Sequence, residues 1–253
     1  QALTHGHSLS PFYRLFDHYL RWFHNRSQLT LVPTSSQLQT LQRRGFEHLQ
    51  LLTSGVDSHL FHPRQRDNAL RTRWGLNDGD IAVLHRGRPN QLLARSWNAL
   101  RSRYPQRRLK LLLLDDGPHD TAPGALVDSL QVEAADAASL ATLMASTDLL
   151  LLAQPGAVAD NMVLQALASG LGIVAFDQGA AAQHIRHGHN GALALPDDAD
   201  SFATATTWLL EDPETLRRVR LNARQYAGRH SWSNISQHLE GYLCSACASP
   251  WPN

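Results

Sequence analysis

Residues 157–177 read AVADNMVLQALASGLGIVAFD and indicate the architecture of the chain around them. A loop of small residues leads into an amphipathic helix, Gly170 ends that helix, and an apolar strand follows. In α/β proteins this layout holds a phosphate or a sugar at the N-terminus of the helix. The polar positions include Asp160 and Gln165, and neither is an obvious catalyst. The stretch therefore predicts a ligand-binding turn with little chemistry of its own.

Segments of strand and helix character alternate on both sides of this stretch. The alternation predicts an α/β protein with a doubly wound, Rossmann-like parallel sheet. Ligands of such sheets bind outside the carboxyl ends of the strands. Strands are expected at 81–85, 108–114, 127–132, 148–152, in the apolar stretch after Gly170, and at 191–195, and helices at 68–74, 92–104, 138–146, 181–187, 200–211 and 213–229.

The first part of the chain follows a less regular pattern. Residues 11–25 form an amphipathic helical pattern rich in aromatic residues, and short strands are expected at 29–34 and 49–52. Ser35 and Ser36 can cap a helix over residues 37–44. Residues 53–67 are polar, contain proline and have the character of a linker.

Composition limits the classes of function. The chain has 253 residues, 43% of them hydrophobic, and a net charge of +1, so it can form one large domain and part of another but is not a typical nucleic-acid binder. Apolar runs such as Leu111–Leu114 have the length of a strand, not of a membrane span. Cys244 and Cys247 form a CxxC without a second ligand pair, which does not favour a metal site and fits a reducing cytoplasm. The chain starts at Gln1 without a signal peptide, so we expect a fragment or a processed product.

Five motifs occur in an order that is typical of one enzyme family: GVDSHLFHP, GR after a strand, DDGP, LQALASGLGIVAFDQGAA and HGHNGALALP. In order and spacing they resemble family-4 glycosyltransferases of the GT-B fold, most closely the bacterial group that uses GDP-mannose or related donors. The resemblance implies retaining transfer of a hexose from a nucleoside diphosphate sugar to an acceptor hydroxyl, without a bound metal or other cofactor. It also implies three regions. These are a remnant of a second Rossmann-like, acceptor-binding domain (1–34), the nucleotide-sugar-binding domain (35–230), and a crossover helix with a tail (231–253).

The phosphate-binding residues match the family only in part. A departing diphosphate needs cations and helix-end amides, and Arg88 beside the flexible Gly87 is placed to supply one cation. Alternatively, Arg88 is an ordinary surface residue of an arginine-rich chain. The family's lysine a few residues later is missing here, and the nearby substitute Arg95 is equally well explained as a solvated helix residue.

The sugar-binding residues depart further from the family pattern. Two glutamates eight residues apart, one for the sugar and one for the ribose, correspond here to Ala157 and Gln165. Asp160 replaces a glycine beside the phosphates, and as a helix cap its carboxylate competes with them for the same amides. The resemblance brings the backbone near Asp160, Asn161 and Met162 to the phosphates.

A histidine near the start of the chain completes the expected site. His5 matches a histidine that faces the donor sugar, with His7 as a rival assignment and a surface role as the alternative for either.

These departures leave two main hypotheses. The first is a divergent transferase, and the second is an inactive relative that binds or scaffolds; an epimerase or phosphorylase of the same fold is a distant third. The expected partners are a nucleotide sugar donor, a carbohydrate or lipid-linked acceptor, and the missing N-terminal domain, with no nucleic acid. We expect a cytoplasmic protein, and a peripheral contact with the inner membrane stays open.

Overall fold

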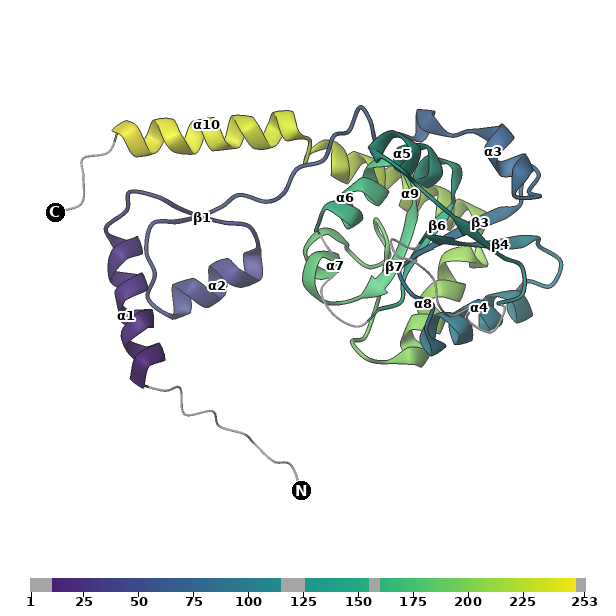
Figure 1. Ribbon diagram of the computed structural model, residues 1–253, viewed down its shortest axis with the longest axis horizontal. Helices are drawn as coiled ribbons and strands as arrows, with labels where there is room; N and C mark the ends of the chain where they lie inside the picture. The colour runs from purple at the N-terminus through teal and green to yellow at the C-terminus, as the bar shows by residue number, and fades with distance from the viewer. Residues whose placement is uncertain (1–10, 115–125, 155–159, 249–253) are drawn as a thin grey trace, which may run out of the picture. The chain divides into compact units, whose positions relative to one another are not determined.

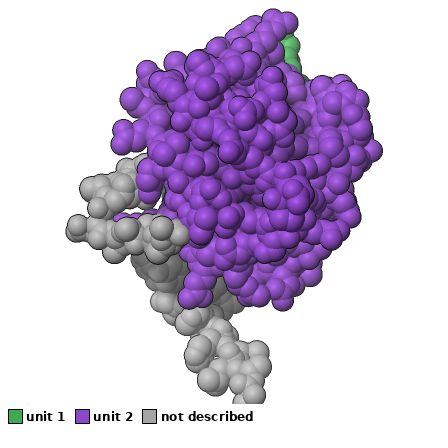
Figure 2. Space-filling view, turned by 90° about the vertical axis from the view of Figure 1, so that its right-hand side faces the viewer, with its two compact units in different colours: residues 1–53, 233–253 green, residues 54–232 purple. Residues whose placement is uncertain are grey.

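The computed structural model describes residues 11–114, 126–154 and 160–248 (Figure 1). The chain forms two compact units: residues 1–53 together with 233–253 are unit 1, and residues 54–232 are unit 2 (Figure 2). Each unit is described by itself.

Unit 2 is built on a parallel sheet in the order β5-β4-β3-β6-β7-β8, counting the described strands. The chain builds outward from β3 to one edge and then returns to build outward from β6 to the other. This is the strand order of a Rossmann fold, and its switch point lies between β3 and β6. The expected doubly wound sheet is therefore confirmed. The strands are β3 (Ile81–Arg86), β4 (Leu109–Leu114), β5 (Ser129–Val132), β6 (Leu149–Leu152), β7 (Gly172–Phe176) and β8 (Ala192–Ala194).

Helices cover both faces of this sheet, and alternate strand residues pack against each layer. Val83 packs with α4 and α8 in one core, whereas Leu84 packs with α5 and α6 in the other. Burial on both faces explains why β6 and β7 are continuously apolar instead of alternating. The helices of unit 2 are η1 (Pro63–Gln65), α3 (Asn68–Arg73), α4 (Gln91–Arg103), α5 (Ala137–Ser146), α6 (Asp160–Ala168), α7 (Gly179–His184), α8 (Ala199–Glu211) and α9 (Pro213–Gly228).

Unit 1 contains the short parallel strands β1 (Thr30–Val32) and β2 (Leu49–Leu51), with helices α1 (Pro11–Asn25), α2 (Ser35–Arg43) and α10 (Trp232–Ala248). Thr34, not Ser35 or Ser36, is the N-cap of α2, because its hydroxyl accepts a hydrogen bond from Gln37 N at 3.1 Å. The sequence predicts that the first region ends at residue 34, whereas the first segment of unit 1 ends at residue 53. The two borders differ because β2 pairs with β1, which keeps α2 and β2 in unit 1.

The described residues contain neither a membrane-spanning helix nor a metal-binding cluster. No helix within the described ranges is both long and apolar enough to cross a bilayer. The same residues contain no cluster of three or more His, Cys, Asp or Glu side chains arranged to hold a metal ion.

Candidate functional site

The carboxyl ends of β3 and β6 meet at the switch point of the sheet, where α/β proteins bind ligands. Gly87 follows β3 with φ +102°, a conformation that L side chains rarely adopt. A Cβ at this position would also collide with the side chain of Gln154, which follows β6. The positive φ is therefore the main reason for glycine at this position, and the absence of a side chain leaves room for Gln154 beside the backbone that follows β3.

Asn90 ties the loop after β3 to the neighbouring strand. Its Nδ2 donates to the carbonyl of Ala153 at 2.6 Å, and its Oδ1 accepts from Leu93 N at 2.8 Å, which caps α4. One side chain thus fixes the end of β6, the loop that carries Arg88 and the start of α4.

Arg86 ends β3 and extends toward the start of α6. Its Nη1 lies 3.5 Å from the sulfur of the buried Met162, and α6 begins at Asp160. Unpaired amides and the helix dipole make a helix N-terminus an anion-binding position. Arg86 therefore brings a guanidinium close to the first turn of α6.

The residues expected to bind the diphosphate have different surroundings. Arg88 is exposed and forms no hydrogen bond or ion pair with the described residues. Arg95 on α4 pairs instead with Asp200 on α8, with Nη2 and Oδ1 2.8 Å apart and both side chains mostly exposed. The described residues therefore leave the Arg88 guanidinium available to a ligand, whereas the Arg95 guanidinium already forms an ion pair with the carboxylate of Asp200.

The expected residues of α6 also differ in accessibility. Asn161 is exposed, Met162 is buried so that only its backbone can face a ligand, and Gln165 is half-buried. The Gln165 side chain has no hydrogen-bond partner among the residues described. His5, Ala157 and the side chain of Asp160 lie outside the described part of the chain.

Two residues of this site were not singled out from the sequence: Arg86 and Asn90. Arg86 extends an apolar strand that was expected to end at His85, and only the strand register shows that its side chain faces α6. Asn90 did carry a signal, because it directly precedes an amphipathic helix as N-caps do. Gln154 begins the strand end 154–160, which the sequence marks as a ligand-binding position, but its contact with Gly87 depends on which strand lies beside β3.

Known proteins with similar sequences are glycosyltransferases. Residues 82–212, just over half of the chain, match the family described as glycosyl transferases group 1. The chain is 27% identical to the sulfoquinovosyl transferase SQD2 of Arabidopsis thaliana (92% of this chain, 47% of that protein) and 26% identical to a GDP-mannose-dependent alpha-mannosyltransferase of Corynebacterium glutamicum (83% and 51%). It thus spans about half the length of these relatives.

A solved structure supports the fold. Anabaena HepE, determined in complex with UDP, aligns with a TM-score of 0.71 at 21% identity. The alignment covers 94% of this chain and 70% of the HepE chain. At this identity the likeness concerns the fold alone, and it agrees with the GT-B expectation.

Proposed function

The chain belongs to the glycosyl transferases group 1 family, and from this premise we propose that it transfers a hexose from a nucleoside diphosphate sugar to an acceptor hydroxyl with retention of configuration. Mannose from GDP-mannose is the first donor to test. The observation that supports the proposal is the position of Arg86 at the end of β3, with its Nη1 3.5 Å from the sulfur of Met162 in the first turn of α6, and of the exposed Arg88 shortly after it, which has no partner among the described residues. Both relatives described above carry hexosyl transfer in their names, which supports the choice of substrate class.

In this proposal Arg88 and Arg86 stabilise the charge that develops on the departing diphosphate. Fixed cations and helix-end amides do this without reorganisation during the reaction, so no metal ion is required. The backbone from Asp160 to Met162 approaches the phosphates, Gln165 binds the ribose, and His5 faces the sugar. Arg95 has a minor part, because Asp200 already neutralises it.

The acceptor-binding surface belongs, in this proposal, to a second domain of which unit 1 is a part. The relatives are about twice as long as the matched region, which leaves room for such a domain. The acceptor is a carbohydrate or a lipid-linked sugar, and the enzyme acts in the cytoplasm at or near the inner membrane.

A second candidate function is an inactive relative that binds or scaffolds. It is favoured by Ala157 and Gln165, which stand where the family has two glutamates. Alanine offers a sugar no side-chain hydrogen bond, and an amide lacks the charge-assisted strength of a carboxylate.

Calorimetric titration of the chain with GDP, UDP, GDP-mannose and UDP-glucose tests the proposal. A transferase site binds at least one nucleoside diphosphate and binds it more weakly as salt is raised, because the contact is ionic. If a folded chain binds none of the four, the transferase proposal fails and the scaffolding function stands.

A further inference from the structure

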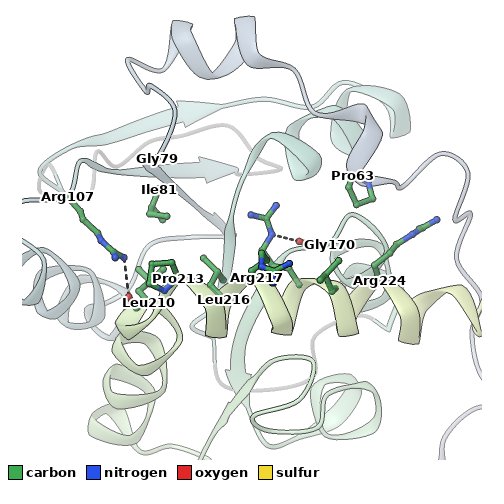
Figure 3. Close-up of a pocket in the computed structure, with 12 residues that line it drawn as sticks. Pro63, Gly79, Ile81, Arg107, Gly170, Leu210, Pro213, Leu216, Arg217 and Arg224 are labelled. Atoms are coloured by element: carbon green, nitrogen blue, oxygen red, sulfur yellow. Dashed lines mark hydrogen bonds between the residues drawn. The ribbon is translucent and has the colours of Figure 1, made fainter.

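A cavity of about 520 Å³ lies at the amino ends of the strands, whereas the candidate site lies at their carboxyl ends (Figure 3). Ile81, the first residue of β3, and Gly170, just before β7, place it at the amino ends of the strands, with α9 along one side. Its volume is in the range of small-molecule sites. The proposed transferase function makes no use of it.

The wall of this cavity combines apolar side chains with arginines. Leu210, Leu216 and Leu221 supply apolar surface, and Leu221 is 54% exposed, so this part of the wall is open to solvent. None of the described residues that line the cavity is acidic. The charged lining residues are Arg107, Arg217, Arg220 and Arg224.

Three of these arginines donate to backbone carbonyls, which position a guanidinium without cancelling its charge: Arg220, from Nε to Gly170 O at 2.7 Å, and the two that follow. Arg107 donates from Nη1 to Leu210 O at 3.1 Å. Arg224 donates to the carbonyls of Ser58, Phe61 and Ala168, at 3.0 to 3.1 Å. Figure 3 shows these two side chains toward opposite ends of the cavity, with Leu216 between them.

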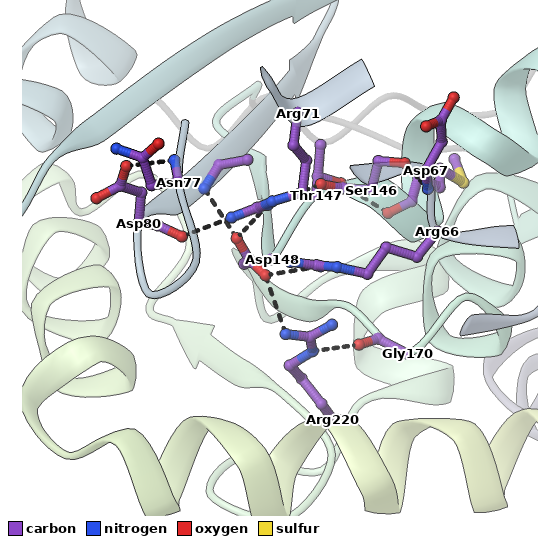
Figure 4. A network of polar contacts seen from close by, with 12 residues as sticks. Arg66, Asp67, Arg71, Asn77, Asp80, Ser146, Thr147, Asp148, Gly170 and Arg220 are labelled. Atoms are coloured by element: carbon purple, nitrogen blue, oxygen red, sulfur yellow. Dashed lines mark hydrogen bonds and ion pairs between the residues drawn. The ribbon is translucent and has the colours of Figure 1, made fainter. Parts of the chain in front are cut away.

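Arg220 connects the cavity to a cluster with an excess of positive charge, in which Arg71 and Asp148 are buried whereas Arg66 and Arg220 are partly exposed (Figure 4). The carboxylate of Asp148 pairs with Arg66 at 3.3 Å, Arg71 at 2.9 Å and Arg220 at 3.1 Å. One carboxylate faces three guanidiniums, so two positive charges remain uncompensated within the cluster. Burial lowers the pKa of Arg220, Asp148 opposes this shift, and the charges of Arg66 and Arg71 add to it.

We propose that this cavity binds a small anionic amphiphile, a molecule with a carboxylate, sulfate or phosphate head and an apolar body. The excess charge of the Asp148 cluster and the carbonyl-bound arginines attract the head, because an anion offsets the cost of buried, unbalanced cations. The leucines bury the apolar body. This cavity is separate from the proposed donor site, which lies at the carboxyl ends of the strands.

Calorimetry with octanoate tests this proposal on the full chain, with octyl glucoside as a neutral amphiphile, both below their micelle concentrations. Arg217→Glu reverses a charge on the cavity wall and removes the exposed pair of Arg217 with Glu214 at 2.8 Å, and Arg218→Glu reverses a charge at the neighbouring exposed position, which does not line the cavity. Leu221→Asp has a matched control in Leu195→Asp, also exposed in unit 2. These exposed positions keep the core intact, and circular dichroism verifies folding.

We expect octanoate to bind the unmodified chain, and each cavity variant to weaken it by about tenfold or more while the controls leave it unchanged. Octyl glucoside should bind much more weakly than octanoate. The proposal is overturned if octanoate does not bind, if variants and controls behave alike, or if the neutral amphiphile binds equally well. GDP and UDP titrations of the same variants keep this result separate from the transferase proposal.

Discussion

Arg88 and Arg95 are both arginines close to the switch point, yet their surroundings predict different roles. Arg88→Ala should weaken nucleoside diphosphate binding by about 1.5–3 kcal/mol, or roughly ten- to a hundred-fold, because it removes a charge-assisted contact. Arg95→Ala should have a much smaller effect, since Asp200 already pairs with that side chain. Calorimetry with GDP and UDP measures both, and equal, small losses would place the phosphates elsewhere.

The positions of the two missing glutamates allow a direct test of whether the site is weakened or lost. Gln165→Glu should tighten nucleoside diphosphate binding by about 1 kcal/mol, because a carboxylate accepts from both ribose hydroxyls. Ala157→Glu should favour the intact sugar nucleotide over the bare diphosphate, and Asp160→Gly should help further, most at low salt.

The control for the added charge is Gln237→Glu, an exposed position on α10. Titrations of the triple variant with GDP, UDP and their sugar conjugates that show no gain would indicate an inactive relative.

How much of the site the sequence predicts depends on whether a residue's role is local. Gly87 and Arg88 were predicted because a strand end followed by glycine is a local pattern. Arg86 was missed because its neighbour α6 is distant in sequence and is brought close by the order of the strands. The ion pair of Arg95 with Asp200 was missed for the same reason.

At the scale of elements, the Asp148 cluster joins the starts of β3 and β6 to α3 and α9. Asp148 accepts from Ala82 N at 2.9 Å as well as from three arginines, and it is buried. Asp148→Asn should lower the free energy of unfolding by about 3–5 kcal/mol, because it leaves buried guanidiniums without their counter-charge. Urea denaturation measures this loss. Asp200→Asn, which breaks the exposed pair with Arg95, should cause no measurable change, and comparable losses in both variants would contradict this account.

His184 on α7 gives the fold a dependence on pH. It is buried, its Nδ1 lies 3.1 Å from the Tyr226 hydroxyl of α9, and burial, aided by the charge of His230, lowers its pKa from 6.5 to about 4. Between these two pKa values His184 is protonated in the unfolded chain but neutral in the folded chain. The free energy of unfolding therefore falls as the pH drops from the unfolded pKa toward the folded pKa.

When the pH is lowered from about 7 to about 4.5, His184 should reduce the free energy of unfolding by about 2–3 kcal/mol, because each pH unit below the unfolded pKa contributes about 1.36 kcal/mol. Urea denaturation at both pH values should show a smaller loss for His184→Gln than for the unmodified chain. His59→Gln, at an exposed histidine, is the control and should keep the full loss. Equal losses in all three proteins would rule out His184 as the source.

The order of helices and strands was predictable from sequence because most elements carry their own periodicity and caps. The apolar runs that became β4, β6 and β7 are continuous because both faces of the sheet are buried. The membership of residues 35–53 was not predictable, since it depends on the pairing of β1 with β2. The cap of α2 is local, but Thr34, Ser35 and Ser36 are all residues that cap helices, so the sequence alone does not choose among them.

At the scale of the whole molecule, unit 1 has the properties of an incomplete domain. Its β1–β2 sheet is parallel and two-stranded among the described residues, whereas parallel sheets normally have more strands with both faces covered. Helix α1 exposes large hydrophobic side chains, and a patch of this kind marks a surface that normally contacts something else. Those side chains are Leu15, Phe16, Tyr19, Trp22 and Phe23. Under the proposed function, this face packs against the remainder of an acceptor-binding domain.

The 253-residue chain alone should therefore bind a nucleoside diphosphate without transferring its sugar. The proposed phosphate contacts lie within unit 2, whereas the acceptor contacts require the part of the relatives that this chain does not span. A radiolabelled-donor assay with candidate acceptors measures transfer, and calorimetry on the same sample shows whether the donor site is intact. Adding the complementary half of a longer homologous protein in trans is the matched comparison, because it restores acceptor contacts without altering unit 2. Robust transfer by the chain alone would mean that unit 1 already supplies the acceptor site.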